Sequence, residues 1–201
     1  MSATNRSYVR LVELAEAQQG YFTTQQALKA GYADNTHPYH VRAGHWLRHC
    51  RGVYRLAHFP LPEDGEMMGW YLWSRNRAQI LQGVYSHQTA LSIYELSDIM
   101  PVKLHLTVPP HFRRSSPIPR VLVLHRGKLA AQDVAKLRGF AVTRPLRTIR
   151  DLSAAQSVSF DILRQAFEEG NRRGLITLTE LERARTLHGL DPALAELFRK
   201  R

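Results

Sequence analysis

The sequence predicts an α+β protein in which an N-terminal winged helix-turn-helix precedes a mixed α/β C-terminal domain. Residues 1–60 show the periodicity and the caps of three short helices, separated by glycines. A short hairpin with glycine in its turn follows the third helix. Beyond residue 60, apolar strand-like runs alternate with helical segments, which is typical of mixed α/β domains.

The first two helices of this segment are indicated by spacing and by caps. Apolar residues recur at helical intervals within residues 8–15, which predicts a first helix. Tyr21-Phe22 is predicted to be a short extended link. Thr23 and the glutamine three residues later form a capping-box pattern, so a second helix is expected over about residues 24–30. Gly31 can adopt the left-handed conformation that ends a helix.

The third helix and the hairpin complete the predicted motif. Residues 34–36 are all good N-caps, and Pro38 falls in the first helical turn, where its missing amide costs least. This helix is expected to end near Ala43. Residues 46–56 then read as a hairpin with Gly52 in the turn. Helix, helix-turn-helix and hairpin is the order of a winged helix.

A domain boundary is predicted in the segment 59–65, which carries two prolines and a glycine. We therefore predict a winged helix-turn-helix domain over residues 1–60 and an α/β domain over residues 61–201. In the second domain we expect helices over residues 67–81, 146–153, 160–173 and 178–188, and a short helix after Asp191-Pro192. A further helix is expected to begin at the caps Ser86 and His87 and to run through residue 96. Strands are expected near residues 84–85, 103–108, 121–125 and 140–143.

Charge is the most informative overall property. The chain has 201 residues, with 28 Lys and Arg against 17 Asp and Glu, a net charge of +11, and an isoelectric point near 10.3. Such a surplus attracts polyanions and is an expected feature of nucleic-acid-binding proteins. Cys50 is the single cysteine, so no internal disulfide is possible. Signal-peptide and membrane-span patterns are not found, so a cytoplasmic protein without membrane contact is expected.

The helix-turn-helix supplies the candidate DNA-binding residues. The second helix of such a pair enters the major groove, where its exposed side chains meet base edges. Arg42 can bond guanine O6 and N7, and arginines on the hairpin suit phosphates. Val41 is expected to face the core. The candidates are Thr24, Gln25, Thr36, His37, Tyr39, His40 and Arg42 from the helices, and Arg48, Arg51 and Arg55 from the hairpin.

Other polar clusters have weaker interpretations. Arg113 and Arg114 mark a basic loop in the second domain, which either extends a DNA footprint or is a solvated connection. Arg144, Arg147 and Arg150 recur every three residues, and Asp151 lies four after Arg147, which is the spacing of a helical ion pair. No pattern typical of a catalytic site, a metal site or a cofactor is found. We therefore predict a protein that is not an enzyme.

Several runs resemble AbiEi-type antitoxins. In the N-terminal domain the resembling runs are Leu11-Val12-Glu13-Leu14-Ala15, Gly20-Tyr21-Phe22-Thr23, Ala27-Leu28-Lys29-Ala30-Gly31 and Arg51-Gly52-Val53-Tyr54-Arg55. In the second domain they are Ser86-His87-Gln88-Thr89-Ala90-Leu91, Leu104-His105-Leu106-Thr107-Val108-Pro109 and Thr143-Arg144-Pro145-Leu146-Arg147-Thr148-Ile149-Arg150-Asp151-Leu152. The resemblance covers about residues 8–155. The third helix departs from the family, whose equivalent is small and basic, in its histidines and its proline.

The resemblance implies a transcriptional autorepressor and antitoxin of a type IV toxin–antitoxin system, of the kind that serves phage defence. Its winged helix would bind inverted repeats in double-stranded DNA upstream of its own operon. The functional partner would be a nucleotidyltransferase-like toxin, countered without a stable complex. Two alternatives stay open, namely the DNA-binding module of a nuclease-like enzyme and a protein-interaction module with a basic surface.

Overall fold

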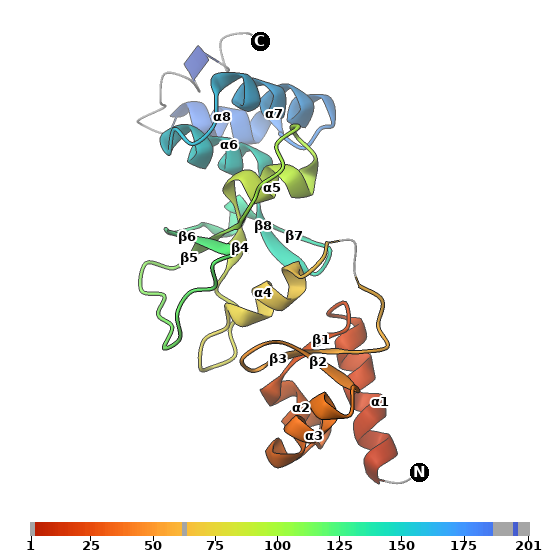
Figure 1. Cartoon of the computed structure of the whole chain (residues 1–201). Coiled ribbons are helices and arrows are strands. Elements are labelled where there is room, and N and C mark those ends of the chain that lie inside the picture. The colour runs from red at the N-terminus through yellow and green to blue at the C-terminus, as the bar shows by residue number, and fades with distance from the viewer. Residues whose placement is uncertain (1–2, 62–63, 187–194, 197–201) are drawn as a thin grey trace. The chain divides into compact units, whose positions relative to one another are not determined.

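The computed structural model describes residues 3–61, 64–186 and 195–196. The chain divides into two compact units, which are described separately. The first unit comprises Met1–Gln82 with Arg138–Phe140, and the second comprises Gly83–Leu137 with Ala141–Arg201. Together they contain helices and two sheets, so the predicted α+β class is confirmed (Figure 1). Among the described residues, no helix is long and apolar enough to cross a membrane.

The first unit contains the predicted winged helix-turn-helix. Its elements are α1 (Ala3–Glu16), β1 (Tyr21–Thr23), α2 (Thr24–Ala30), the 3₁₀ turn η1 (Asp34–Thr36), α3 (His37–Arg42), β2 (Trp46–Cys50), β3 (Val53–Leu56) and α4 (Met67–Trp73). Thr23 and Gln26 form the capping box predicted for α2. Gly31 ends α2 at a φ of 106°, and a Cβ there would lie 2.6 Å from Ser7 Oγ, so both backbone and space favour glycine.

A three-stranded antiparallel sheet joins these helices, in the order β1-β3-β2. The segment predicted as an extended link is strand β1 at the edge of this sheet, because Phe22 pairs with Tyr54 and Tyr21 with Arg55. Side chains alternate between the two faces of such a sheet. Phe22, Tyr54 and Trp46 therefore share one face with the helical core, while Tyr21 and Arg55 lie on the other.

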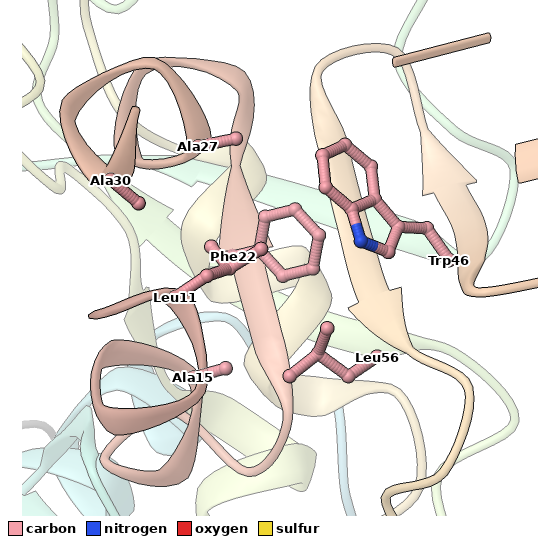
Figure 2. Packing of buried hydrophobic residues seen from close by; sticks show 7 residues of the cluster. All are labelled: Leu11, Ala15, Phe22, Ala27, Ala30, Trp46 and Leu56. Carbon is pink, nitrogen blue, oxygen red and sulfur yellow. The ribbon is translucent and has the colours of Figure 1, made fainter. Parts of the chain in front are cut away.

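The core of the winged helix joins α1, α2 and the sheet. Figure 2 shows its buried side chains, which are Leu11, Ala15, Phe22, Ala27, Ala30, Trp46 and Leu56. The rings of Phe22 and Trp46 meet edge to face with centroids 4.9 Å apart. Such pairing adds to the stabilisation from burying apolar area. Val41 packs against this cluster, as predicted.

The first unit extends beyond the predicted DNA-binding segment. Residues 1–60 lie within it, but α4 contacts β1 and β3 and so belongs to the same unit. His49 lies between Tyr21 and Trp70, with ring centroids 5.5 and 4.2 Å away. Helix α4 was predicted to reach Leu81, but it ends at Trp73. Beyond it Asn76 exchanges hydrogen bonds with Ile80 to form a turn, which explains the difference.

The second unit is built on a five-stranded mixed sheet with the order β6-β5-β4-β8-β7. Its strands are β4 (Val84–Tyr85), β5 (Leu104–Val108), β6 (Leu122–Arg126), β7 (Val134–Leu137) and β8 (Phe140–Thr143). Strand β4 pairs antiparallel with β5 and parallel with β8, and β5 pairs parallel with β6. Four of the strands lie close to their predicted positions, whereas β7 and the preceding 3₁₀ turn η2 (Ala131–Asp133) were not predicted.

The helices of the second unit within the described residues are α5 (His87–Tyr94), α6 (Pro145–Ala154), α7 (Phe160–Arg172) and α8 (Leu178–Thr186). Helix α5 packs on β5 and on α6, and α6 packs on α7 (Figure 1). Apolar side chains on these helices, among them Leu91, Ile149 and Leu152, are fully buried. These helices confirm the sequence prediction. Of the helix expected after Asp191-Pro192 only residues 195–196 are described, and they are helical.

Three histidines form a polar cluster in the second unit, which we call the histidine stack. His87 lies face to face with His125, with ring centroids 3.5 Å apart, and His105 Nδ1 lies 3.0 Å from His125 Nε2. Burial, followed by the neighbouring imidazoles, lowers the pKa of His87 to about 3. Burial likewise lowers the pKa of His105 to about 4. The stack is therefore uncharged at neutral pH.

Candidate nucleic-acid interface

The exposed face of α3 carries the first part of the candidate interface. Tyr39 keeps 57% of its surface exposed, and Arg42 at the end of the helix is also exposed. Neither side chain takes part in the core cluster. An arginine and a tyrosine on a short, well-anchored helix can donate hydrogen bonds to base edges or phosphates.

The two histidines of α3 differ from the prediction. His37 was expected to be exposed, but only 3% of its surface is accessible. Its ring packs against Trp46 and Tyr54, with centroids 5.2 and 6.0 Å away. The cause is the position of His37 at the first turn of α3, where the side chain faces the sheet. His37 is therefore a core residue and is removed from the candidate interface.

His40 is half-buried and stacks on Trp46 at a centroid distance of 4.6 Å. Its Nδ1 lies 3.4 Å from the Nδ1 of His45. Burial lowers the pKa of His40, and the neighbouring His45 and His37 lower it further. At neutral pH the imidazole is uncharged, so it can offer one N–H to a nucleic acid but no positive charge.

The hairpin of β2 and β3 carries the second part of the candidate interface. Arg48 is exposed and lies opposite Tyr54, so it shares the sheet face on which the helices pack. Arg51 is exposed in the hairpin turn. The turn is held in place because Gly52 O accepts hydrogen bonds from Thr24 N at 3.1 Å and from Arg75 Nη2 at 2.7 Å. The first residue of α2 and Arg75 therefore position the hairpin.

Arg55 was predicted to contact phosphate, but the structure gives it another role. Its Nη1 donates a hydrogen bond to Phe59 O at 2.5 Å. Arg55 pairs with Leu47 and Tyr21, so it lies on the sheet face away from the helical core. We correct the prediction accordingly, because a half-buried guanidinium engaged on the opposite face is not available beside α3.

The remaining candidates are dispersed. Gln25 is exposed on α2, and Thr24 is half-buried where α2 meets the hairpin turn. Thr36 Oγ1 donates to Ala33 O at 2.6 Å, which leaves the hydroxyl oxygen as an acceptor. The candidates of the basic loop lie in the second unit, where Arg113 is exposed and Arg114 half-buried.

Acidic and metal-binding groups are sparse around these residues. Asp34 is the one carboxylate within η1 and α3, and its Oδ1 lies 3.5 Å from His37 Nδ1. Within the part of the chain that the structure describes, no three His, Cys, Asp or Glu side chains are placed to hold a metal ion. The exposed charges on α3 and in the hairpin are therefore cationic, which suits a polyanion.

Comparison with known proteins identifies this segment. Residues 9–57 match the family model described as "Transcriptional regulator, AbiEi antitoxin". We call residues 9–57 the AbiEi-type domain because of this similarity. The match runs from α1 to just beyond β3, and it confirms the resemblance that the sequence predicted for this domain. The matched family is one of transcriptional regulators and antitoxins, and the resemblance of the runs beyond residue 57 stays a prediction.

One solved structure resembles nearly the whole chain, so this similarity extends beyond the AbiEi-type domain. The crystal structure of the RV2827C protein from Mycobacterium tuberculosis aligns with a TM-score of 0.59. The alignment covers 96% of this chain and 75% of that one, at 15% sequence identity. At this identity the similarity concerns the fold alone. No curated protein matches the chain in a sequence comparison.

Sequence reasoning missed two residues that position the AbiEi-type domain. Arg75 follows α4 and holds the hairpin turn through Gly52, and Trp46 supports both histidines of α3. No local pattern links Arg75 with a glycine 23 positions earlier. The burial of Trp46, in contrast, was foreseeable, because a tryptophan at the start of a predicted strand usually packs in a core.

Proposed function

We propose that this protein is a DNA-binding transcriptional autorepressor that also acts as the antitoxin of a type IV toxin–antitoxin system. The observation that carries the proposal is the exposed pair Tyr39 and Arg42 on α3, in an AbiEi-type domain whose hairpin exposes Arg48 and Arg51. A net charge of +11 supports attraction to DNA.

In the proposed complex, α3 enters the major groove of double-stranded DNA. Arg42 donates to guanine O6 and N7, and Tyr39 contacts a neighbouring base or phosphate. Arg48 and Arg51 neutralise phosphates beside the groove, with Gln25 as a further phosphate contact. Two copies would bind the two halves of an inverted repeat upstream of the protein's own operon, since symmetric operators are read by symmetric pairs.

Binding to the upstream DNA should weaken steeply with salt, because phosphate contacts release counterions. We expect Arg51→Ala to weaken binding to all duplexes alike and to lower the salt dependence. Arg42→Ala should cost about 1–3 kcal/mol on the operator and much less on unrelated DNA, because it removes a base contact. Fluorescence anisotropy with labelled operator and scrambled duplexes, over a salt series, measures both effects.

Arg164→Ala serves as the matched control, because it removes the same charge from an exposed position on α7 of the second unit. It should bind both duplexes as the unaltered protein does. Equal affinity of the unaltered protein for operator and scrambled DNA would exclude the autorepressor. If Arg42→Ala and Arg164→Ala weakened binding equally, overall charge rather than α3 would explain the interaction.

The antitoxin part of the proposal involves a nucleotidyltransferase-like toxin that is countered without a stable complex. Expression of the product of an adjacent nucleotidyltransferase-like gene should arrest growth, and co-expression of this protein should restore it. The rescue should survive Arg42→Ala when both genes are driven by unrelated promoters, because only repression needs the base contact. Absence of rescue, with both proteins detected in the cell, would refute the antitoxin role.

A further inference from the structure

A second charged site, unrelated to the AbiEi-type domain, lies in the second unit. It is a pocket of about 380 Å³ that is lined by residues of η2, α6 and α8 and by residues next to them. Its charged lining consists of Arg144, Arg147, Arg150, Arg183, Asp133 and Glu180. Asp151 pairs with Arg147, so four guanidinium groups are set against three carboxylates, which leaves a formal surplus of one positive charge. A pocket of this size holds a small organic molecule.

Ion pairs fix two of the arginines at the pocket wall. Arg147 Nη1 lies 2.6 Å from Asp133 Oδ2, and its Nε lies 2.8 Å from Asp151 Oδ1. Arg144 Nη1 lies 3.0 Å from Glu180 Oε1. The Arg144 side chain remains 44% exposed, so part of its guanidinium is accessible. Preorganised guanidinium groups lose less conformational freedom when an anion binds.

Arg150 differs from these two. It is half-buried on α6 and lines the pocket, but its side chain makes no hydrogen bond or ion pair with another residue that the structure describes. Burial raises the pKa of the neighbouring Asp151, and the charges of Arg147 and Arg150 oppose this rise. Arg150 therefore has its donors available for an anion in the pocket.

Helix α6 adds a second cationic feature. The helix has ten residues and begins at Pro145, and its N-cap residue Arg144 makes no side-chain hydrogen bond to the first turn. The first turn of α8 is different, because Glu180 Oε2 accepts from both the amide and the hydroxyl of Thr177 at 2.9 Å. The N-terminal end of α6 therefore has no side-chain cap, and Arg144 and Leu146 at this end line the pocket.

We propose that this pocket binds a small phosphate monoester. A phosphate group is an anion that suits a pocket with surplus positive charge, and arginine forks suit its oxygens. Part of the lining is apolar, contributed by Ala131, Val134, Leu146 and Ala184. This part fits the organic group of an ester rather than inorganic phosphate alone. The proposal is independent of DNA binding by the AbiEi-type domain.

Calorimetric titration of the full chain tests the proposal, with AMP as the monoester probe and adenosine as its neutral counterpart. AMP should bind and adenosine should not, and inorganic phosphate should bind more weakly than AMP. Arg150→Ala should weaken AMP binding at least about tenfold, because it removes charge-assisted hydrogen bonds. Arg150→Lys should retain part of the affinity, and Arg164→Ala should retain all of it.

Several outcomes would overturn the proposal. These are no AMP binding at millimolar concentration, equal binding of AMP and adenosine, equal binding of AMP and inorganic phosphate, and AMP binding unchanged by Arg150→Ala. Binding of an RNA oligonucleotide through Arg150, without AMP binding, would assign the pocket to nucleic acid instead. Circular dichroism and urea unfolding of Arg150→Ala establish that a loss of binding is not a loss of fold.

Discussion

Trp46→Ala is expected to reduce the free energy of unfolding of the first unit by about 3–5 kcal/mol. Only 3% of the surface of Trp46 is exposed. Its ring lies 4.9 Å from Phe22, 5.0 Å from Tyr32 and 4.6 Å from His40 between centroids. Alanine would leave a cavity between the sheet and α3, and the loss of stability includes the cost of this cavity.

The same substitution should abolish DNA binding, because α3 is anchored through the rings that pack on Trp46. Urea unfolding followed by circular dichroism measures the stability, and anisotropy with operator DNA measures the binding. Leu47→Ala is the matched control, since Leu47 is the next residue of β2 and is 44% exposed. It should change stability by no more than about 0.5 kcal/mol. A loss below about 1 kcal/mol for Trp46→Ala would contradict this account of the core.

Acid should destabilise the second unit through the histidine stack. In the unfolded chain a histidine titrates near 6.5, whereas burial holds the pKa of folded His87 at about 3. Below pH 6.5 the unfolded state therefore binds protons that the folded state does not, so stability falls as pH falls toward the folded pKa. From about pH 7.5 to about pH 5, His87 alone should account for a loss of roughly 2 kcal/mol.

Urea unfolding at the two pH values checks this expectation. His87→Gln removes the titratable ring but keeps an amide that can reach Ser86 Oγ, which lies 3.0 Å from His87 Nδ1. The variant should be less stable at neutral pH, and its loss on acidification should be smaller by roughly 2 kcal/mol. His111→Gln, on the exposed loop after β5, should keep the full loss. An unchanged pH dependence in His87→Gln would show that the stack does not govern acid sensitivity.

Much of the fold was predictable because its signals are local. The caps at Thr23 and Gly31 and the hairpin turn at Gly52 act within a few residues, and the structure contains all three. Strand β7 was not predicted, since residues 134–137 are few and lack strict alternation. Helix α4 was predicted too long, because the turn that Asn76 and Ile80 form depends on hydrogen bonds that periodicity does not report.

The candidate interface was predictable only in part. Tyr39, Arg42, Arg48 and Arg51 are exposed, as a surface role requires. His37 was misjudged because a polar residue in the first turn of a short helix can face either side, and the packing of Trp46 decides which. The pairing of Arg147 with Asp151 was expected from spacing and is present.

The order of helices, the hairpin and the cationic surplus follow from the amino-acid sequence by itself, since each depends on neighbouring residues or on composition. Only the tertiary structure decided which groups each arginine contacts. It directed Arg55 to the carbonyl of Phe59 and gathered Arg144, Arg147 and Arg150 around one pocket. The physical reason is that side-chain burial and pairing depend on contacts between segments distant in the chain.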